Sequence, residues 1–170
     1  AADAVGATRL HRPEWIAAHP HTKDLYLTLT NGSGNNAPVN SGRDPNPYGH
    51  IVRIAEHRRD ATQTSFGWEV FLLAGDPAYD SAVPATQTVF GSPDGIWVDP
   101  DGRVWIETDI SNSSQNRADR GYDNIKNNGL YAATHLYILN HFYQEMPGGG
   151  PLSARPPDQQ RGDAGGWHFE

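Results

Sequence analysis

Short segments that alternate apolar and polar residues follow one another along the first half of the chain, separated by runs of turn-forming residues. β-Branched and aromatic side chains in these segments favour strands. Four strands are predicted in this way, at residues 15–18, 25–30, 49–54 and 68–73. Residues 31–47 are dense in Asn, Gly, Ser and Pro, which predicts a long loop. The pattern as a whole indicates an antiparallel meander.

The start of this meander recurs later in the chain. Pro13-Glu14-Trp15-Ile16 returns 80 positions later as Pro93-Asp94-Gly95-Ile96, and Leu25-Tyr26-Leu27 returns as Val104-Trp105-Ile106. The second copy therefore again predicts a strand, a tight turn and a strand. A four-stranded unit that starts over is typical of a β-propeller blade, whose faces are buried only against neighbouring blades. We expect an all-β chain, a β-propeller fragment of about one and a half four-stranded blades.

The repeat also divides the chain into regions. Residues 1–133 are expected to form the partial propeller, with one blade at about 12–75 and the start of the next at about 92–133. The pattern is lost at about Thr134, and the end of the chain is rich in Pro and Gly, so an irregular and disordered tail is predicted for residues 134–170. Because the chain begins Ala1-Ala2 with neither Met nor a secretory signal, we expect an excerpt of a longer protein.

Composition narrows the classes of function. Thirteen Lys and Arg against 20 Asp and Glu give a net charge of −7, which argues against a nucleic-acid partner. No apolar run is long enough to predict a membrane-spanning helix. Cysteine is absent, which excludes a thiol nucleophile and a thiolate metal ligand within these 170 residues.

Two acidic residues occupy the same position in the two copies, Glu14 and Asp94, each at the entry of the first strand. In a propeller this strand lines the central channel, so carboxylates from successive blades converge there and favour a hard cation such as calcium. We expect both side chains to point into one shared cavity. The alternative is that each is a turn residue whose carboxylate accepts nearby backbone N–H groups. Both interpretations remain open.

Arg12 precedes Glu14 by two residues, so both side chains leave an extended strand on the same face. An arginine there suits a phosphate or a carboxylate, which it can bind with two parallel N–H bonds. The alternative is a simple salt bridge with an acid. Trp97 follows Asp94 by three residues and either donates its indole N–H to a ligand or belongs to the core.

The chain resembles the PhoX-type alkaline phosphatases over about residues 1–128. Five ordered motifs carry the resemblance: Arg12-Pro13-Glu14-Trp15, residues 25–31, residues 46–51, residues 71–76 and residues 92–97. Members of that family are secreted bacterial β-propellers that hydrolyse phosphomonoesters with a cluster of calcium and iron. The resemblance implies the same fold, a phosphomonoester substrate, calcium and iron as cofactors, and a periplasmic or secreted location.

The resemblance also implies roles for particular residues. Glu14 and Asp94 look like metal ligands, Arg12 looks like the guanidinium that holds the substrate phosphate, and Trp97 looks like a phosphate contact through its indole. The implied chemistry is metal-assisted hydrolysis, in which cations neutralise the phosphate oxygens while Arg12 stabilises charge in the transition state.

One departure from the family limits this expectation. The family's metal cluster also takes a cysteine thiolate and carboxylates from other blades, and this chain has no cysteine. The segment alone is therefore expected to lack a complete site and to be inactive, with the missing propeller blades as its partners. Two other functions stay open, a calcium-dependent lactonase-type propeller hydrolase and a non-catalytic propeller that serves as a binding scaffold.

Overall fold

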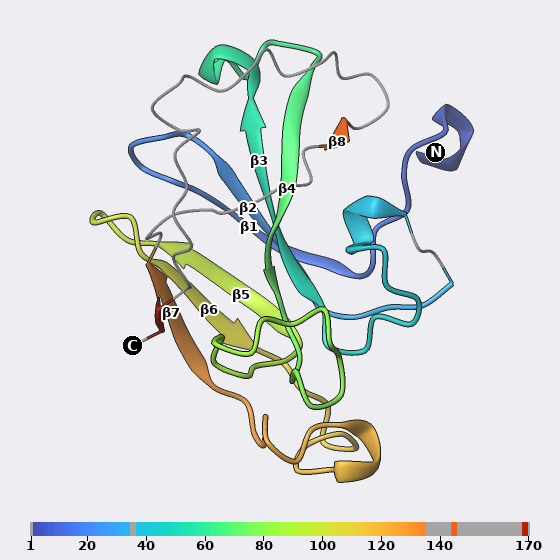
Figure 1. Cartoon of the computed structure of the whole chain (residues 1–170). Coiled ribbons are helices and arrows are strands. Elements are labelled where there is room, and N and C mark those ends of the chain that lie inside the picture. Colours follow the sequence, from blue (N-terminus) through green and yellow to red (C-terminus); the bar gives the residue numbers. More distant parts are fainter. Residues whose placement is uncertain (1, 35–36, 135–143, 146–167, 170) are drawn as a thin grey trace.

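The strands form two antiparallel sheets that lie side by side (Figure 1). The computed structural model describes residues 2–34, 37–134, 144–145 and 168–169. The first sheet has the order β1-β2-β3-β4-β8, with β1 (Pro13–Ala18), β2 (Leu25–Leu29), β3 (His50–Glu56), β4 (Phe66–Leu73) and β8 (Gln144–Glu145). The second has the order β5-β6-β7-β9, with β5 (Pro93–Val98), β6 (Val104–Thr108), β7 (Leu130–Thr134) and β9 (His168–Phe169). Short 3₁₀ turns punctuate the connections: η1 (Ala2–Val5), η2 (Pro38–Asn40), η3 (His57–Arg59) and η4 (Ala118–Arg120).

The predicted all-β fold of propeller blades is confirmed. β1 to β4 pair in sequence order as a meander, and β5 to β7 begin the same pattern again. Most of the predicted tail, residues 135–143, 146–167 and 170, lies outside the described residues. The two short strands that are described there pair β8 with β4 and β9 with β7. The predicted boundary and disorder of the tail stay predictions.

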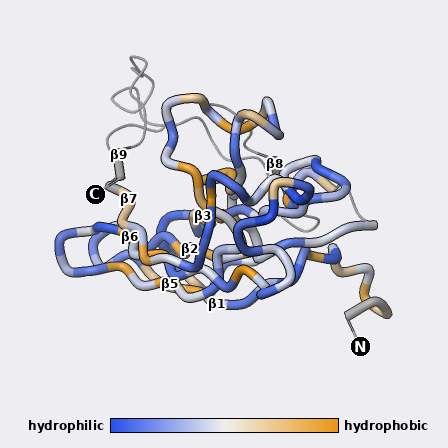
Figure 2. The backbone as a smooth tube through the Cα atoms, turned by 90° about the horizontal axis from the view of Figure 1, so that it is seen from below, coloured by the Kyte–Doolittle hydropathy of each residue, from blue (hydrophilic) through white to orange (hydrophobic). Residues whose placement is uncertain are grey.

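The main core lies between the two sheets. Tyr26 and Phe71 from the first sheet pack with Ile96 and Ile106 from the second, and all four are buried. Figure 2 shows apolar residues in parts of the strands and also in some of the connections. Burying a side chain of this size stabilises the fold by about 1.5–3 kcal/mol. A propeller blade buries its face against the next blade in this way, and the contact fixes how the two sheets meet.

The sequence repeat is repeated in the backbone. Each inner strand, β1 and β5, begins with a bulge, because its pairing shifts between Pro13 and Ile16 and again between Pro93 and Ile96. Arg12 and Ser92, just before these bulges, both have left-handed backbones, with φ of 45° and 56°. Residues other than glycine rarely adopt a left-handed backbone. Left-handed residues and β-bulges both occur often at functional sites.

Thr28 ties the two inner strands together. Its fully buried hydroxyl accepts the Trp15 N–H at 3.0 Å and lies 2.6 Å from the Asp94 carbonyl oxygen. A side chain of β2 thus reaches both β1 and β5 at the level of their bulges. As a result, the repeated segments that begin at Arg12 and Ser92 end up next to each other.

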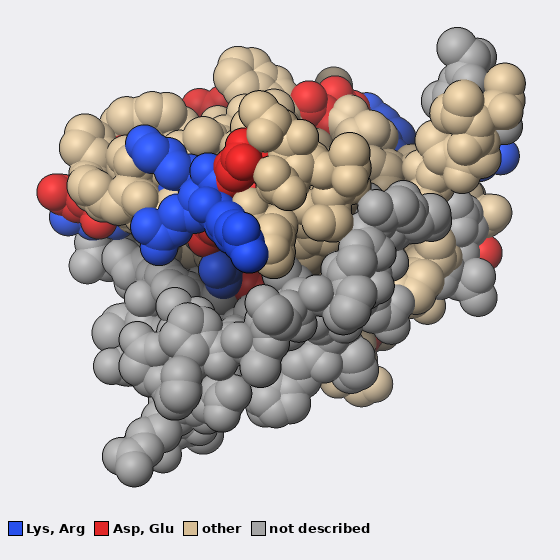
Figure 3. All heavy atoms as spheres, turned by 90° about the horizontal axis from the view of Figure 1, so that it is seen from above, with Lys and Arg blue, Asp and Glu red and all other residues tan. Residues whose placement is uncertain are grey.

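The surface carries charges of both signs. Figure 3 shows the molecule from the side on which the connection between β3 and β4 lies. Basic side chains gather on this face, and acidic side chains lie next to them. No helix among the described residues is both long and apolar enough to cross a membrane.

Candidate functional site

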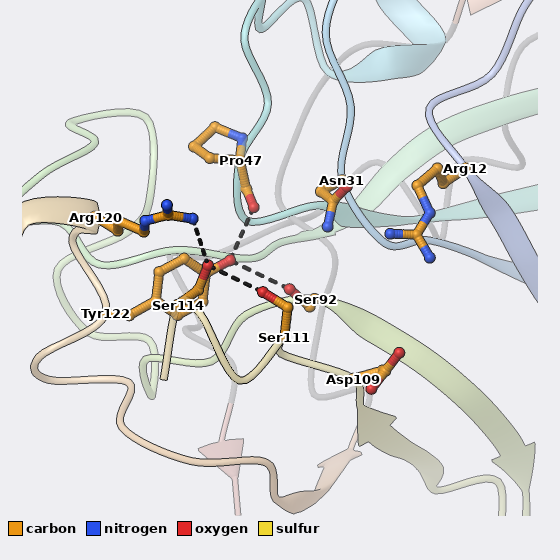
Figure 4. Close-up of a pocket in the computed structure, with 9 residues that line it drawn as sticks. All are labelled: Arg12, Asn31, Pro47, Ser92, Asp109, Ser111, Ser114, Arg120 and Tyr122. Carbon is orange, nitrogen blue, oxygen red and sulfur yellow. Dashed lines mark hydrogen bonds between the residues drawn. The ribbon is translucent and has the colours of Figure 1, made fainter. Parts of the chain in front are cut away.

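A polar cavity of about 360 Å³ opens where the two inner strands begin (Figure 4). Its volume is within the usual range of small-molecule sites. Its lining consists of Arg12, Asn31, Pro47, Ser92, Asp109, Ser111, Ser114, Arg120 and Tyr122. These residues lie in the connections next to the strands of both sheets, so the cavity forms where the two blades meet.

The repeat explains two of these lining residues, Arg12 and Ser92. Arg12 and Ser92 hold equivalent places before β1 and β5, and each has a carbonyl oxygen that accepts an N–H from the end of the neighbouring strand. Thr30 donates to Arg12 at 3.1 Å, and Asp109 donates to Ser92 at 2.8 Å. The same local structure therefore delivers two polar side chains to one place.

Five more lining residues come from the loop at residues 109–128, which Tyr122 fastens to the loop that precedes β3. The Tyr122 hydroxyl donates to the Pro47 carbonyl oxygen at 2.8 Å and lies 3.2 Å from the Ser92 hydroxyl (Figure 4). Its ring also contacts the Tyr48 ring, with 5.2 Å between centroids. Burial raises the pKa of Tyr122, so the phenol keeps its proton and remains a donor at neutral pH.

Gly121 is needed for this contact. Its backbone is left-handed, with φ of 69°, and a Cβ at this position would collide with the Tyr48 hydroxyl. Glycine alone meets both requirements at no steric cost. Tyr122 is thereby placed against Tyr48.

His50 holds the facing loop at residues 31–49. Its Nε2 lies 2.7 Å from the Val39 carbonyl oxygen, and its Nδ1 lies 2.9 Å from the Asn46 amide nitrogen. A neutral imidazole with the proton on Nε2 satisfies both bonds. Burial lowers the pKa of His50 to about 3, so the neutral form persists in the folded protein.

Arg12 reaches the cavity with a largely exposed side chain. Its Nη2 lies 3.2 Å from Glu14 Oε1, so the salt bridge that the sequence offered as an alternative is present. The two side chains are 55% and 33% exposed, and pairs as exposed as this contribute little stability. The guanidinium keeps further N–H groups for a ligand, so the salt bridge and anion binding are compatible.

Glu14 and Asp94 lie close enough to interact electrostatically. Burial is the main cause that raises the pKa of Asp94; the charge of Glu14 adds to this and Arg12 opposes it. No hydrogen bond from a described residue reaches the Asp94 carboxylate, so the turn-residue alternative does not hold for Asp94. Neither acid lines the cavity of Arg12, and among the described residues no three His, Cys, Asp or Glu side chains could hold a metal ion together.

Trp97 lies apart from Arg12. Its side chain is 59% exposed and borders a second, apolar hollow of about 440 Å³, formed with Trp15, Trp105, Glu107 and Leu130 among others. The neighbouring Ile96 also borders this hollow but is buried and packs in the core between the sheets. The structure thus does not bring Trp97 to the cavity of Arg12, and its predicted contact with phosphate stays a prediction.

The sequence analysis missed several residues of the site. Ser92 could have been found, because Ser92-Pro93-Asp94 is the repeat partner of Arg12-Pro13-Glu14. Arg120 and Tyr122 could not, because they lie in a polar loop without any periodicity.

The fold and the site together define a propeller-type β protein with an arginine-lined polar cavity between two blades. Residues 1–141 match the sequence family described as alkaline phosphatase PhoX. The chain therefore belongs to the PhoX alkaline phosphatase family, and the resemblance expected from its motifs is confirmed. The match extends past Thr134, where the pattern was expected to end. A comparison with curated proteins gives no match.

A solved structure of Pseudomonas fluorescens PhoX, in complex with vanadate as a transition-state analogue, is similar to this chain. The TM-score is 0.65 and the sequences are 35% identical. The alignment covers 78% of this chain and 24% of that one, so these residues correspond to about a quarter of the Pseudomonas fluorescens protein.

Proposed function

We propose that this chain forms the arginine side of the active site of a metal-dependent phosphomonoesterase. The observation that carries the proposal is Arg12, whose strained backbone and exposed guanidinium lie at the opening of a polar cavity between two blades. Family membership and the likeness to a vanadate-bound PhoX support it. The substrate class is a phosphate monoester.

The role proposed for Arg12 follows from its chemistry. A guanidinium can donate two parallel N–H bonds to phosphate oxygens, and it stabilises the negative charge that spreads over those oxygens during transfer. Asn31 lines the same cavity and adds a neutral amide donor. Removing one such donor costs an enzyme about a hundredfold or more in rate.

The described residues do not fit a complete metal centre. Glu14 and Asp94 supply oxygen ligands of the kind that calcium takes, yet no third His, Cys, Asp or Glu completes a group with them in the part of the chain that the structure describes. The calcium and iron proposed for the active protein therefore require ligands from elsewhere. The chain alone is proposed to be inactive, and a periplasmic or secreted location is proposed for the active protein.

The apolar hollow around Trp97 fits a further blade as the missing partner. Trp15, Trp97 and Leu130 are each 59% exposed although they lie on strands. Propeller blades bury such faces against the next blade, and the match to a quarter of a longer PhoX chain agrees with this. We therefore propose that another blade of the active protein covers this face.

The test is turnover by the full-length protein that carries these residues. Hydrolysis of p-nitrophenyl phosphate, with competitive inhibition by orthovanadate and loss of activity after chelation, would support the proposal. Hydrolysis of a lactone such as dihydrocoumarin without any phosphomonoester hydrolysis would favour the lactonase alternative. Absence of both activities and of bound metal would favour the binding scaffold.

A further inference from the structure

The cavity has a second arginine, Arg120, which the proposed phosphate chemistry does not use. Arg12 and Arg120 enter the cavity from opposite sides, with the serine hydroxyls and Tyr122 between them (Figure 4). We propose that the Arg120 end binds a second acidic group, a carboxylate or a phosphate, on the alcohol part of the substrate. This inference rests on the proposed function and narrows its substrate class.

Arg120 can bind an anion, although its charge already interacts with that of Asp119. It is the last residue of η4, is exposed, and makes no ion pair with a described residue. Its only side-chain bond within the described chain runs from Nη1 to the Ser114 hydroxyl at 3.3 Å. Arg117, three residues earlier, is instead paired with Asp119 at 2.6 Å. Arg120 therefore has more unused N–H groups for a ligand than Arg117 has.

The hydroxyls beside Arg120 are arranged as donors. Ser114 Oγ accepts from Arg120 and also from the Ser111 hydroxyl at 3.2 Å. Its own O–H is then left to donate, because its acceptor positions are occupied. A guanidinium with spare N–H groups beside a free O–H suits a carboxylate or phosphate better than a neutral alcohol. The one acid in the lining, Asp109, lies nearer Arg12 than Arg120 (Figure 4).

The size of the cavity leaves room for such a group. Its volume of about 360 Å³ corresponds to roughly a dozen water molecules at about 30 Å³ each, whereas a phosphate has only five non-hydrogen atoms. If the transferred phosphate lies against Arg12, an alcohol part that extends along the cavity reaches Arg120. An acidic substituent at that end would meet the second guanidinium.

The test compares matched substrate pairs on the full-length protein that carries these residues. 3-Phosphoglycerate differs from glycerol 3-phosphate by a carboxylate, and fructose 1,6-bisphosphate differs from fructose 6-phosphate by a phosphate. We expect kcat/KM to be about tenfold higher for the acidic member of at least one pair, as a charge-assisted contact in a partly exposed site provides. The pair that shows the preference identifies the acidic group.

Arg120→Gln should bring that ratio close to one, and Arg120→Lys should keep part of it because the charge remains. Lys126→Gln is the matched control on the same loop, because it removes a positive charge outside the cavity without unpairing Asp119, and it should keep the full ratio. A ratio near one in the wild type, or a ratio that survives Arg120→Gln, overturns the inference while leaving the phosphatase itself intact. Absence of turnover on every phosphomonoester instead overturns the proposed function, and this inference with it.

Discussion

Replacing Tyr122 by Phe tests how the cavity is assembled. The substitution keeps the ring contact with Tyr48 but removes the hydroxyl that bonds to the Pro47 carbonyl oxygen at 2.8 Å and to Ser92 at 3.2 Å. Each bond contributes about 0.5–1.5 kcal/mol net. Pro47 is exposed, so water can replace the bond lost at its carbonyl oxygen, whereas Ser92 is only 2% exposed. We therefore expect the loop at residues 109–128 to lose about 1–2 kcal/mol of local stability.

Hydrogen exchange of the full-length protein measures this directly. A loss of about 1–2 kcal/mol corresponds to exchange that is about 5–30 times faster in peptides that cover residues 109–128. Tyr26→Phe is a matched control, because Tyr26 is also buried and packs on Phe71 at 4.7 Å, away from the cavity. Protection should stay the same in the loop of that variant. Unchanged protection in Tyr122→Phe would refute the view that this hydroxyl fastens the loop.

The same contact predicts a coupling. Ser92→Ala removes the partner of one of the two bonds, so the double variant with Tyr122→Phe should lose less than the sum of the two single variants. Strict additivity, measured by exchange in the same peptides, would mean that the two hydroxyls act independently and that their 3.2 Å contact contributes nothing.

Three further outcomes follow. Gly121→Ala should lower the melting temperature and reduce kcat/KM more than Tyr122→Phe does, because its left-handed backbone and its contact with Tyr48 both oppose a side chain; equal activity would contradict this. The unfolding free energy should fall by about 1.4 kcal/mol per pH unit between about pH 6 and 4, because His50 binds a proton near pH 6.5 when unfolded but only near pH 3 when folded. Denaturant unfolding at several pH values should show this slope in the wild type and a shallower one in His50→Gln. The 170-residue chain alone should not hydrolyse p-nitrophenyl phosphate, and measurable turnover would contradict the incomplete metal centre.

Much of the fold could be predicted because it depends on local patterns. Alternating side chains and turn residues fixed the positions of β1 to β4, and the copied Pro13-Glu14 and Pro93-Asp94 segments indicated that a second sheet starts over. These signals are encoded within a few residues of each strand. The same repeat also predicted that Glu14 and Asp94 lie near each other.

The site was less predictable because it depends on contacts between distant segments. Tyr122 bonds to Pro47 across 75 positions of the chain, and nothing in either loop indicates the other. The position of Trp97 relative to the cavity of Arg12 was also not predictable from the sequence. The cavity of Arg12 lies where β1 and β5 begin, whereas Trp97 lies near the end of β5, where its exposed side chain borders the apolar hollow.

The most direct measurement compares Arg12→Ala with Arg58→Ala in the full-length protein. Arg58 is also exposed but lies in the distant connection between β3 and β4. We expect Arg12→Ala to lower kcat/KM for p-nitrophenyl phosphate about a hundredfold, with the metal content unchanged by elemental analysis, and Arg58→Ala to leave both values unchanged. A metal-loaded Arg12→Ala protein with undiminished turnover would contradict the role of Arg12 in binding phosphate.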